Sequence, residues 1–369
     1  MSVKRVAITT GGGDCPGLNA VIRAVVRVGK EKYGWDILGI EDAMNGLVDL
    51  DYRSPHGNMW LDEATVRGIL ARGGTILGTS NRSDPFRYVV KDPSGRERET
   101  DVSDVVMKNF EQLGLDAMIS IGGDGSMRIS ARFLEKGMNI VGVPKTIDND
   151  LPGTDQTFGF DTAVDVATDA LDRLRDTADS HDRVILVEVM GRDAGWIALH
   201  AGLAGGADCI LIPEIPYDIE PIAKQIRRRR AAGKNYSLIC VAEGAKPKGG
   251  DASVGESRAG AMPRLMGAAQ RVAEALSEQL EADLRVTVLG HIQRGGSPSS
   301  YDRVLATRYG VAAAELVAKE EFGKMVSLRN GDIVAVDMPS ADTPPRLVSP
   351  DDQTVQQARD MGVCFGEGR

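Results

Sequence analysis

The residues best suited to chemistry in this sequence lie in five loops, and each loop follows an apolar, strand-like run. The first loop, Thr9–Gly17, holds three consecutive glycines between a strand and a helix. Glycine allows backbone amides to approach a phosphate group at the N-terminus of the following helix. A tight turn explains these glycines as well as phosphate binding does, so this loop alone decides nothing.

A second glycine loop, Ile121–Ser126, has an aspartate inside it. A carboxylate beside a phosphate site can hold Mg²⁺, which bridges phosphate oxygens. The alternative is that Asp124 caps the helix that follows. A helix cap does not need a glycine on each side, and Asp124 lies between Gly123 and Gly125. We therefore favour the magnesium role.

The third loop, Pro144–Asp150, holds two carboxylates two residues apart, Asp148 and Asp150, together with Thr146 and Asn149. One carboxylate can accept the proton of a hydroxyl nucleophile while the other supports the metal. A turn rich in aspartate and asparagine is the structural alternative. The loop by itself does not distinguish a catalytic role from a turn.

The last two loops place arginine next to glycine at the end of a strand: Glu188–Gly195 contains Arg192, and Gly290–Pro298 contains Arg294. A guanidinium group binds phosphate through two parallel hydrogen bonds, and glycine lets the ligand come close. One such arginine is usually a surface residue, whereas several at strand ends predict a phosphate clamp. Glu243, which ends another strand, is either an acceptor for sugar hydroxyls or a solvated carboxylate.

Alternating strands and helices must position these loops. Continuous apolar strands that alternate with helices imply parallel sheets covered on both faces, which bind ligands at the carboxyl ends of their strands. Apolar runs predict strands at Val6–Ile8, Ile37–Ile40, Ala117–Ile121, Ile140–Val143, Val184–Val187, Cys209–Ile212, Ser237–Val241 and Val286–Leu289. Helices are expected at about Leu18–Lys32, Thr157–Thr177, Tyr217–Ala232 and Ala261–Leu280, and polar excursions at Arg87–Asp101 and Lys246–Gly260.

The composition sets outer limits on the function. A chain of 369 residues suits one large or two medium α/β domains. The N-terminus lacks a signal-peptide pattern, no apolar run reaches about 18 residues, and the four cysteines are far apart. These features predict a cytoplasmic protein with free thiols that does not cross a membrane. The formal net charge of −9 argues against nucleic-acid binding, so local arginines and amides must hold any anionic substrate.

Together the loops resemble the phosphofructokinase family, in order, from Gly11 to about Arg303. Diacylglycerol kinases and NAD kinases are similar around a Gly-Gly-Asp-Gly loop alone. Neither has the other three motifs, so the combination is specific. The matching motifs are Gly-Gly-Asp-Gly-Ser at 122–126, Thr-Ile-Asp-Asn-Asp at 146–150, Met-Gly-Arg at 190–192 and Gly-His-Ile-Gln-Arg-Gly-Gly at 290–296.

The resemblance implies a 6-phosphofructokinase, which transfers the γ-phosphoryl group of ATP to the 1-hydroxyl of fructose 6-phosphate in glycolysis. It implies that Asp148 is the general base, with Thr146 and Arg192 as the other catalytic residues, and that Asp124 binds Mg²⁺. The residues implied to line the nucleotide phosphates are Gly13, Arg82, Gly125 and Ser126. Those implied to bind the sugar phosphate are Thr146, Asp148, Met190, Gly191, Arg192, Glu243, His291 and Arg294.

The same resemblance implies an oligomer. Arg183 and Arg285 match arginines that the family supplies from a neighbouring subunit, so we expect a homodimer or homotetramer with shared active sites. We predict two three-layer α/β domains with mainly parallel sheets and the active site in the cleft between them. The donor domain would hold residues 1–159 and about 298–325. The sugar-phosphate domain would hold residues 160–297 and about 326–369.

Two positions bear on the phosphoryl donor. Family members that use pyrophosphate have an aspartate at the place of Gly125 and a lysine at the place of Lys145, so the two markers disagree. An aspartate at position 125 would intrude on and repel the α-phosphate of a nucleotide, whereas Lys145 is compatible with either donor. We therefore predict ATP, with pyrophosphate as the alternative. Met44 falls where bacterial ATP enzymes have an aromatic residue, which predicts weaker adenine stacking.

The sequence disfavours two other classes of function. A non-catalytic regulator that binds a sugar phosphate is expected to have lost Asp148 or Asp124, and both are present. A dehydrogenase is disfavoured because Gly11–Gly17 does not follow the G-x-G-x-x-G pattern of a dinucleotide site.

Overall fold

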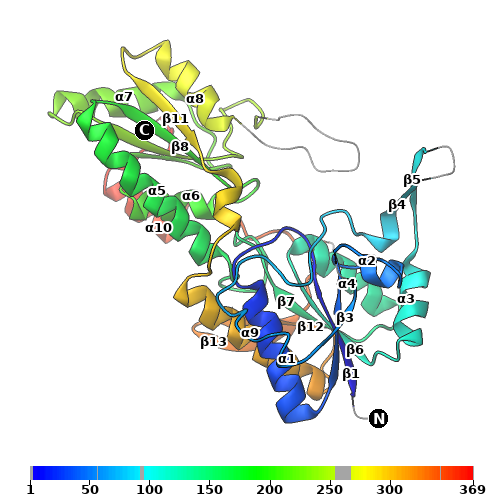
Figure 1. Ribbon diagram of the computed structural model, residues 1–369. Coiled ribbons are helices and arrows are strands. Elements are labelled where there is room, and N and C mark those ends of the chain that lie inside the picture. Colours follow the sequence, from blue (N-terminus) through cyan, green and yellow to red (C-terminus); the bar gives the residue numbers. More distant parts are fainter. Residues whose placement is uncertain (1–2, 56, 92–94, 254–266, 341, 369) are drawn as a thin grey trace. The chain divides into compact units, whose positions relative to one another are not determined.

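The computed structural model describes residues 3–55, 57–91, 95–253, 267–340 and 342–368, and the chain forms two compact units (Figure 1). Unit 1 and unit 2 are each assembled from three separate segments of the chain. Unit 1 comprises Met1–Ile147, Leu151–Gly159 and Arg294–Pro345. Unit 2 comprises Asp148–Asp150, Phe160–Gln293 and Arg346–Arg369.

Unit 1 is built on a seven-stranded sheet with the order β13-β12-β7-β6-β1-β2-β3. The strands from β12 to β2 are parallel, and the outer strands β13 and β3 are antiparallel to their neighbours. The bounds are β1 Arg5–Thr10, β2 Asp36–Ile40, β3 Met59–Leu61, β6 Ala117–Gly122, β7 Ile140–Pro144, β12 Lys324–Arg329 and β13 Asp332–Asp337. The carboxyl ends of β1, β6 and β7 therefore meet at one edge of the sheet.

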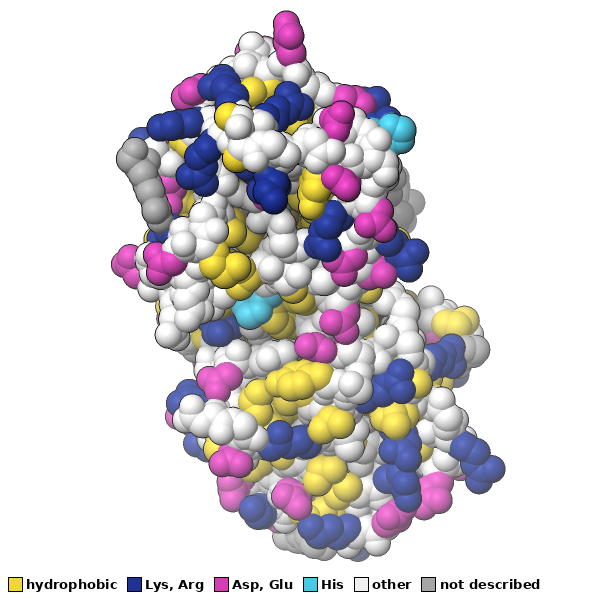
Figure 2. All heavy atoms as spheres, turned by 90° about the vertical axis from the view of Figure 1, so that its left-hand side faces the viewer, with side chains coloured by type: hydrophobic (Ala, Val, Ile, Leu, Met, Phe, Trp, Pro, Cys, Tyr) yellow, Lys and Arg dark blue, Asp and Glu magenta, His cyan; other side chains and the backbone are white. Residues whose placement is uncertain are grey.

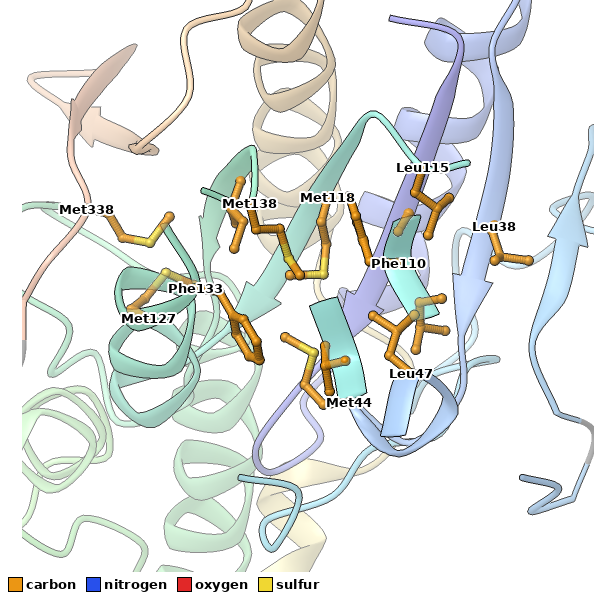
Figure 3. Packing of buried hydrophobic residues seen from close by; sticks show 14 of the residues in the cluster. Leu38, Met44, Leu47, Phe110, Leu115, Met118, Met127, Phe133, Met138 and Met338 are labelled. Carbon is orange, nitrogen blue, oxygen red and sulfur yellow. The ribbon is translucent and has the colours of Figure 1, made fainter. Parts of the chain in front are cut away.

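Helices cover both faces of this sheet. On one face, α1 (Leu18–Tyr33) packs against α9 (Ser300–Ala318), and Gly29 of α1 lies against Ile37 of β2. On the other face, alternate strand residues point to α2 (Asn45–Val48), α3 (Ser103–Gln112) and α4 (Asp124–Glu135). Figure 3 shows this second face, where Phe110 of α3 and Phe133 of α4 pack against strand residues such as Leu38 and Met118. Each such buried side chain contributes about 1.5–3 kcal/mol.

The polar excursion at Arg87–Asp101 contains a small antiparallel sheet. After the short 3-10 helix η1 (Pro85–Arg87), β4 (Tyr88–Lys91) pairs with β5 (Glu97–Thr100). Residues 92–94, which connect the two strands, lie outside the described residues. The second excursion is described only to residue 253, so the remainder of that expectation also lies outside them.

Unit 2 contains a four-stranded parallel sheet with the order β11-β8-β10-β9. Helices α7 and α8 share a hydrophobic cluster with one face, while Gly202 of α6 lies against Ile210 and Cys240 on the other. Helix α5 packs against α6, so the unit has three layers, and α10 contacts α6. The bounds are α5 Phe160–Ser180, β8 Val184–Val189, α6 Trp196–Ala204, β9 Cys209–Leu211, α7 Ile219–Ala231, β10 Ser237–Ala242, α8 Ala268–Ser277, β11 Leu284–Val288, the 3-10 helix η2 Gly290–Arg294 and α10 Gln353–Asp360.

The predicted class of fold, α/β units with mainly parallel sheets, is confirmed, with local corrections. The sequence predicts residues 326–345 in the second domain, but they lie in unit 1 because β12 pairs with β7 and β13 pairs with β12. It predicts residues 148–150 in the first domain, whereas Asp148–Asp150 belong to unit 2. Unit 1 also resumes at Arg294 and not at about 298. Helix α5 starts at Phe160 because Gly159 has a left-handed φ of 95°. The expected helix at Ala261–Leu280 corresponds to α8, and its expected start falls in residues 254–266, which are outside the described residues.

Within the described ranges, no helix combines the length and the apolar character that a membrane span requires. On the face shown in Figure 2, basic and acidic side chains are interspersed among the described residues.

Candidate active site

The two glycine loops of unit 1 lie side by side because β1 and β6 are neighbouring parallel strands. The backbone N–H of Gly11 donates to the carbonyl of Ile121 at 2.9 Å. The hydroxyl of Ser126 lies between the loops: a Cβ atom on Gly11 would come within 2.5 Å of it, and one on Gly122 would also collide with it. Glycine at both positions is therefore a packing requirement, and it brings Ser126 to the first loop.

Two basic side chains contact the first loop. Lys145 is 3% exposed, and its Nζ atom donates to the carbonyl of Gly13. Arg294 donates from Nη1 to the carbonyl of Asp14 at 3.3 Å, and a Cβ atom on Gly13 would lie 2.7 Å from the same nitrogen. Arg294, which was predicted to bind the sugar phosphate, thus lies at the loop predicted to bind nucleotide phosphates. Two cations against one glycine loop give it the charge that attracts a phosphate group.

Asp124 is the first residue of α4, not its cap. The N-cap is Gly123, and no side chain caps this helix, so the capping alternative is wrong. The Oδ2 atom of Asp124 lies 2.9 Å from Nε of Arg128. Its Oδ1 atom is buried and has no hydrogen-bond partner among the described residues. Buried polar atoms normally have a partner, and a bound cation would supply one here.

The surroundings of Asp124 are compatible with Mg²⁺. Among the described residues, no group of three or more His, Cys, Asp or Glu side chains forms a complete metal site. Mg²⁺ does not need one, since it is commonly held by one or two carboxylates, water and substrate phosphates. A single uncommitted carboxylate oxygen beside two phosphate-type loops fits that chemistry.

Gly125 is exposed, and a Cβ atom built on it would meet no atom within 4 Å. Its φ angle is not left-handed, so the backbone accepts other residues. The protein itself therefore does not require glycine at position 125.

The loops after β6 and β7 are also in contact. The N–H of Lys145 donates to the carbonyl of Gly122 at 2.9 Å, and a Cβ atom on Gly123 would lie 3.2 Å from the carbonyl oxygen of Lys145. The carbonyl of Thr146 accepts a hydrogen bond from Thr157 Oγ1 at 2.7 Å. Thr146 is thus held next to the loop of Asp124.

The segment that carries Arg82 is tied to the first glycine loop through its backbone. Ser80 accepts from the N–H of Gly12 at 3.3 Å through its carbonyl, and from the N–H of Arg82 at 3.1 Å through its hydroxyl. The side chain of Thr79 donates to the carbonyl of Gly12. Arg82 itself is exposed, so its guanidinium group is available to a phosphate bound at that loop.

In unit 2, the predicted sugar-phosphate residues Met190, Gly191, Arg192 and Glu243 lie at the carboxyl ends of the paired strands β8 and β10. The N–H of Glu243 donates to the carbonyl of Val189 at 2.9 Å. The N–H of Gly244 donates to the carbonyl of Gly191 at 3.1 Å. A Cβ atom on Gly244 would overlap the carbonyl oxygen of Arg192. The backbone contact therefore fixes the two loops against each other.

Gln293 was not predicted to have a role. It is completely buried, and its Oε1 atom accepts a hydrogen bond from the N–H of Met190 at 2.8 Å. Gln293 belongs to η2, which also carries the exposed His291. Gln293 therefore anchors the 3-10 helix of His291 to the loop after β8. The only sequence signal was a polar residue inside the Gly-His-Ile-Gln-Arg motif.

Arg183 and Arg285 do not join the other sugar-phosphate residues of unit 2. Both form ion pairs with Asp283, at 2.8 Å and 2.6 Å respectively. The hydrogen bond from Arg183 and the charge of Arg285 lower the pKa of Asp283. This cluster lies at the amino ends of β8 and β11, whereas Met190 and Glu243 follow carboxyl ends of the same parallel sheet.

Met44 does not face an open site. Its side chain is 4% exposed and lies in the hydrophobic cluster of unit 1, as Figure 3 shows. Its backbone N–H donates to Ser83 Oγ at 3.0 Å. This side chain is therefore committed to the core and is not placed to stack on adenine, and weaker adenine stacking stays a prediction.

Comparisons with known proteins show the family of this chain. The family model described as phosphofructokinase matches residues 5–317. ATP-dependent 6-phosphofructokinase 2 of Clostridium perfringens is 48% identical, over 99% of this chain and 99% of its own. The ATP-dependent 6-phosphofructokinase of Chloroflexus aggregans is 49% identical, over 99% of this chain and 98% of its own. This chain belongs to the phosphofructokinase family.

Solved phosphofructokinase structures confirm the predicted fold. The enzyme from Saccharomyces cerevisiae superposes with a TM-score of 0.74 at 34% identity, covering 91% of this chain and 45% of the yeast chain. The pyrophosphate-dependent phosphofructokinase from Marinobacter aquaeolei has a TM-score of 0.76 at 20% identity, covering 98% of this chain and 91% of that one. At that identity the likeness concerns the fold alone. The predicted family is confirmed by the family model and by the two relatives of 48% and 49% identity.

Proposed function

We propose that this phosphofructokinase is an ATP-dependent 6-phosphofructokinase of glycolysis. It transfers the γ-phosphoryl group of ATP to the 1-hydroxyl of fructose 6-phosphate, which yields fructose 1,6-bisphosphate and ADP. The observation that carries this proposal is the edge of the unit 1 sheet, where two adjoining glycine loops meet Lys145, Arg294 and the uncommitted Oδ1 atom of Asp124. These groups suit a polyphosphate and its divalent cation.

The donor binds unit 1 in this proposal. The glycine loops present backbone amides to the phosphates at Gly13 and Gly125, with the hydroxyl of Ser126 and the guanidinium group of Arg82 as further donors. Asp124 holds Mg²⁺, which supplies Lewis-acid neutralisation of phosphate charge when it is bound. The open space at Gly125 supports ATP over pyrophosphate because it leaves room for the α-phosphate.

The acceptor chemistry needs one base and good alignment. Asp148 accepts the proton of the 1-hydroxyl as the oxygen attacks phosphorus, while Thr146 lies beside it in the chain. Arg192 stabilises the negative charge of the transferring phosphoryl group. The residues that bind and orient fructose 6-phosphate are Thr146, Asp148, Met190, Gly191, Arg192, Glu243, His291 and Arg294.

A neighbouring subunit completes the site in this proposal, so the enzyme is a homodimer or homotetramer. Arg183 and Arg285 lie at the amino ends of their strands, away from the other sugar-phosphate residues of their own sheet. From that edge they reach the substrate of a second copy. Strand β11 is an edge strand, and Val288 at its end is 53% exposed, as expected of a surface that a second copy covers. The glycolytic reaction implies a cytoplasmic enzyme.

The proposal is tested by product formation from fructose 6-phosphate and Mg²⁺, with ATP or pyrophosphate in parallel and EDTA in a third reaction. We expect fructose 1,6-bisphosphate with ATP only, and none with EDTA. Product with pyrophosphate only would overturn ATP as the donor. Product with neither donor would overturn the assignment as a 6-phosphofructokinase.

A further inference from the structure

Arg346 in unit 2 holds the peptide groups that follow Asp148. Its Nη1 atom donates to the carbonyl of Asn149 at 3.1 Å, and its backbone N–H donates to the carbonyl of Asp150 at 2.8 Å. Asn149 has a left-handed φ of 52°, a conformation that is uncommon for non-glycine residues and that asparagine adopts more readily than most. Two hydrogen bonds from Arg346 hold this turn immediately after the proposed base.

Arg346 also contacts Trp196, the first residue of α6, through both its side chain and its backbone. The guanidinium carbon of Arg346 lies 4.2 Å from the centroid of the indole ring, and the indole Nε1–H donates to the carbonyl of Arg346 at 2.9 Å. A planar guanidinium group can lie on an aromatic ring while its N–H groups donate hydrogen bonds in its own plane, a geometry that the ammonium group of lysine does not offer. The backbone and the side chain of Arg346 are therefore both held.

Glu214 also links the segment that follows Arg346 to the residue that precedes α6. Its Oε1 atom accepts from the N–H of Gly195 at 3.0 Å and from the N–H of Val348 at 2.8 Å. Gly195 immediately precedes α6 and ends the loop that carries Arg192. The segment Arg346–Val348 thus connects the end of a proposed sugar-phosphate loop with the loop of the proposed base.

We propose that Arg346 is a positioning residue for phosphoryl transfer, which sets the place of Asp148 by holding the carbonyls of Asn149 and Asp150. Through Trp196, it ties that placement to the loop of Arg192. The inference rests on the proposed function, in which Asp148 is the base. A group that must lie within hydrogen-bond reach of a hydroxyl loses much of its effect when its loop moves, and a displacement of about 1 Å can cost about 10²-fold in rate.

The chain offers a matched control in Arg359. Arg359 lies in α10, its guanidinium carbon lies 5.4 Å from the ring centroid of Phe365, and its Nη1 atom donates to the carbonyl of Pro350 at 2.7 Å. Its Nη2 atom pairs with Glu367. Arg359→Met therefore removes a stacked, hydrogen-bonded arginine whose described contacts lie within the C-terminal segment. Arg346→Met keeps the aliphatic stem of Arg346 and removes its guanidinium group.

The first arm of the test is hydrogen exchange of the peptide that spans residues 146–152, read by mass spectrometry. We expect faster exchange in Arg346→Met than in the wild type, and no change in Arg359→Met. Unchanged exchange in Arg346→Met would overturn the positioning role whether or not the wild type is active. A wild type without 6-phosphofructokinase activity would overturn the proposed function and leave this arm readable.

The second arm is a double-mutant cycle with Asp148→Asn. We expect Arg346→Met to lower kcat about 10²-fold in the wild-type background, with little change in the KM for ATP, and to have almost no further effect in Asp148→Asn. Arg346→Lys should restore little, because the stacked fork is lost. An equal loss of kcat in both backgrounds, or an equal loss in Arg359→Met, would overturn action through Asp148.

Discussion

The ammonium group of Lys145 donates a hydrogen bond to the carbonyl of Gly13, so a buried cation lies directly behind the first glycine loop. Lys145 is the residue that, taken alone, would indicate a pyrophosphate donor. Its contact within the loop gives it a role that does not depend on which donor is bound: it fixes the loop and adds positive charge to it.

Lys145→Met should therefore weaken use of ATP. Loss of a hydrogen bond to a charged group costs about 1.5–3 kcal/mol, which corresponds to a decrease in kcat/KM for ATP of about 10-fold to 10²-fold. Lys136→Met is the control, because Lys136 pairs with Asp104 at 2.6 Å on the surface of the same unit. Steady-state kinetics that show equal effects of the two substitutions would contradict the role of Lys145.

Gly125→Asp should impair the use of ATP without lowering the stability of the protein. A side chain at this position meets no protein atom within 4 Å of its Cβ, so the melting temperature should hardly change. A carboxylate there would repel the α-phosphate of ATP, and we expect kcat/KM for ATP to fall by about 10²-fold. Gly125→Ala should stay near wild type. Equal kinetics in the two variants would rule out the electrostatic argument.

Gly244→Ala should damage the sugar-phosphate site through the backbone. The added methyl group would overlap the carbonyl oxygen of Arg192, so the loop after β8 must shift. We expect a free energy of unfolding lower by about 1–3 kcal/mol and a raised KM for fructose 6-phosphate, with the KM for ATP little changed. Gly125→Ala serves as the control for an added methyl group. A KM for fructose 6-phosphate equal to that of the wild type would contradict this account of the contact.

The stability of unit 2 should decrease in mild acid because of His200. Burial lowers the pKa of His200, the charge of Asp352 opposes this shift, and the charge of Arg346 adds to it. The aromatic rings of Phe160 and Trp196 lie against the imidazole, with centroids 5.3 Å and 6.2 Å away. Because the folded pKa lies below that of the unfolded chain, the stabilisation is complete above about pH 6.5 and is lost as the pH falls toward the folded pKa.

Urea unfolding at pH 7.5, 6.5 and 5.5 measures this effect. We expect the free energy of unfolding to fall between pH 6.5 and pH 5.5, with a slope contributed by His200 of at most about 1.4 kcal/mol per pH unit. His200→Gln should show a smaller decrease over that interval. The same decrease in both proteins would mean that other groups carry the acid sensitivity.

The buried parts of the fold were predictable because their pattern is local. The apolar runs at Val6–Ile8 and Val184–Val187 are central strands of parallel sheets, and such strands are apolar on both faces. The edge strand β13 was missed although Ile333–Val336 form a continuous apolar run, and in the structure its side chains are exposed or only partly buried. Its place in unit 1 depends on pairing with β12, which the local pattern does not contain.

The candidate site was predictable only where a motif is contiguous. The loops of Asp124 and Gly191 could be found because the chemistry and the glycines lie together in the chain. Arg346 could not, because its partner Asn149 is 197 positions away and Trp196 is 150 positions away. No motif surrounds Arg346, and only the folded chain shows that its side chain reaches the loop of Asp148.

The most direct test of the central claim compares turnover and binding in Asp148→Asn. If Asp148 is the general base, kcat with ATP and fructose 6-phosphate should fall by about 10²-fold to 10⁴-fold, while the Kd for fructose 6-phosphate, measured by calorimetry, changes only a few-fold. A kcat close to that of the wild type, in a variant that folds and binds the sugar phosphate normally, would contradict the account.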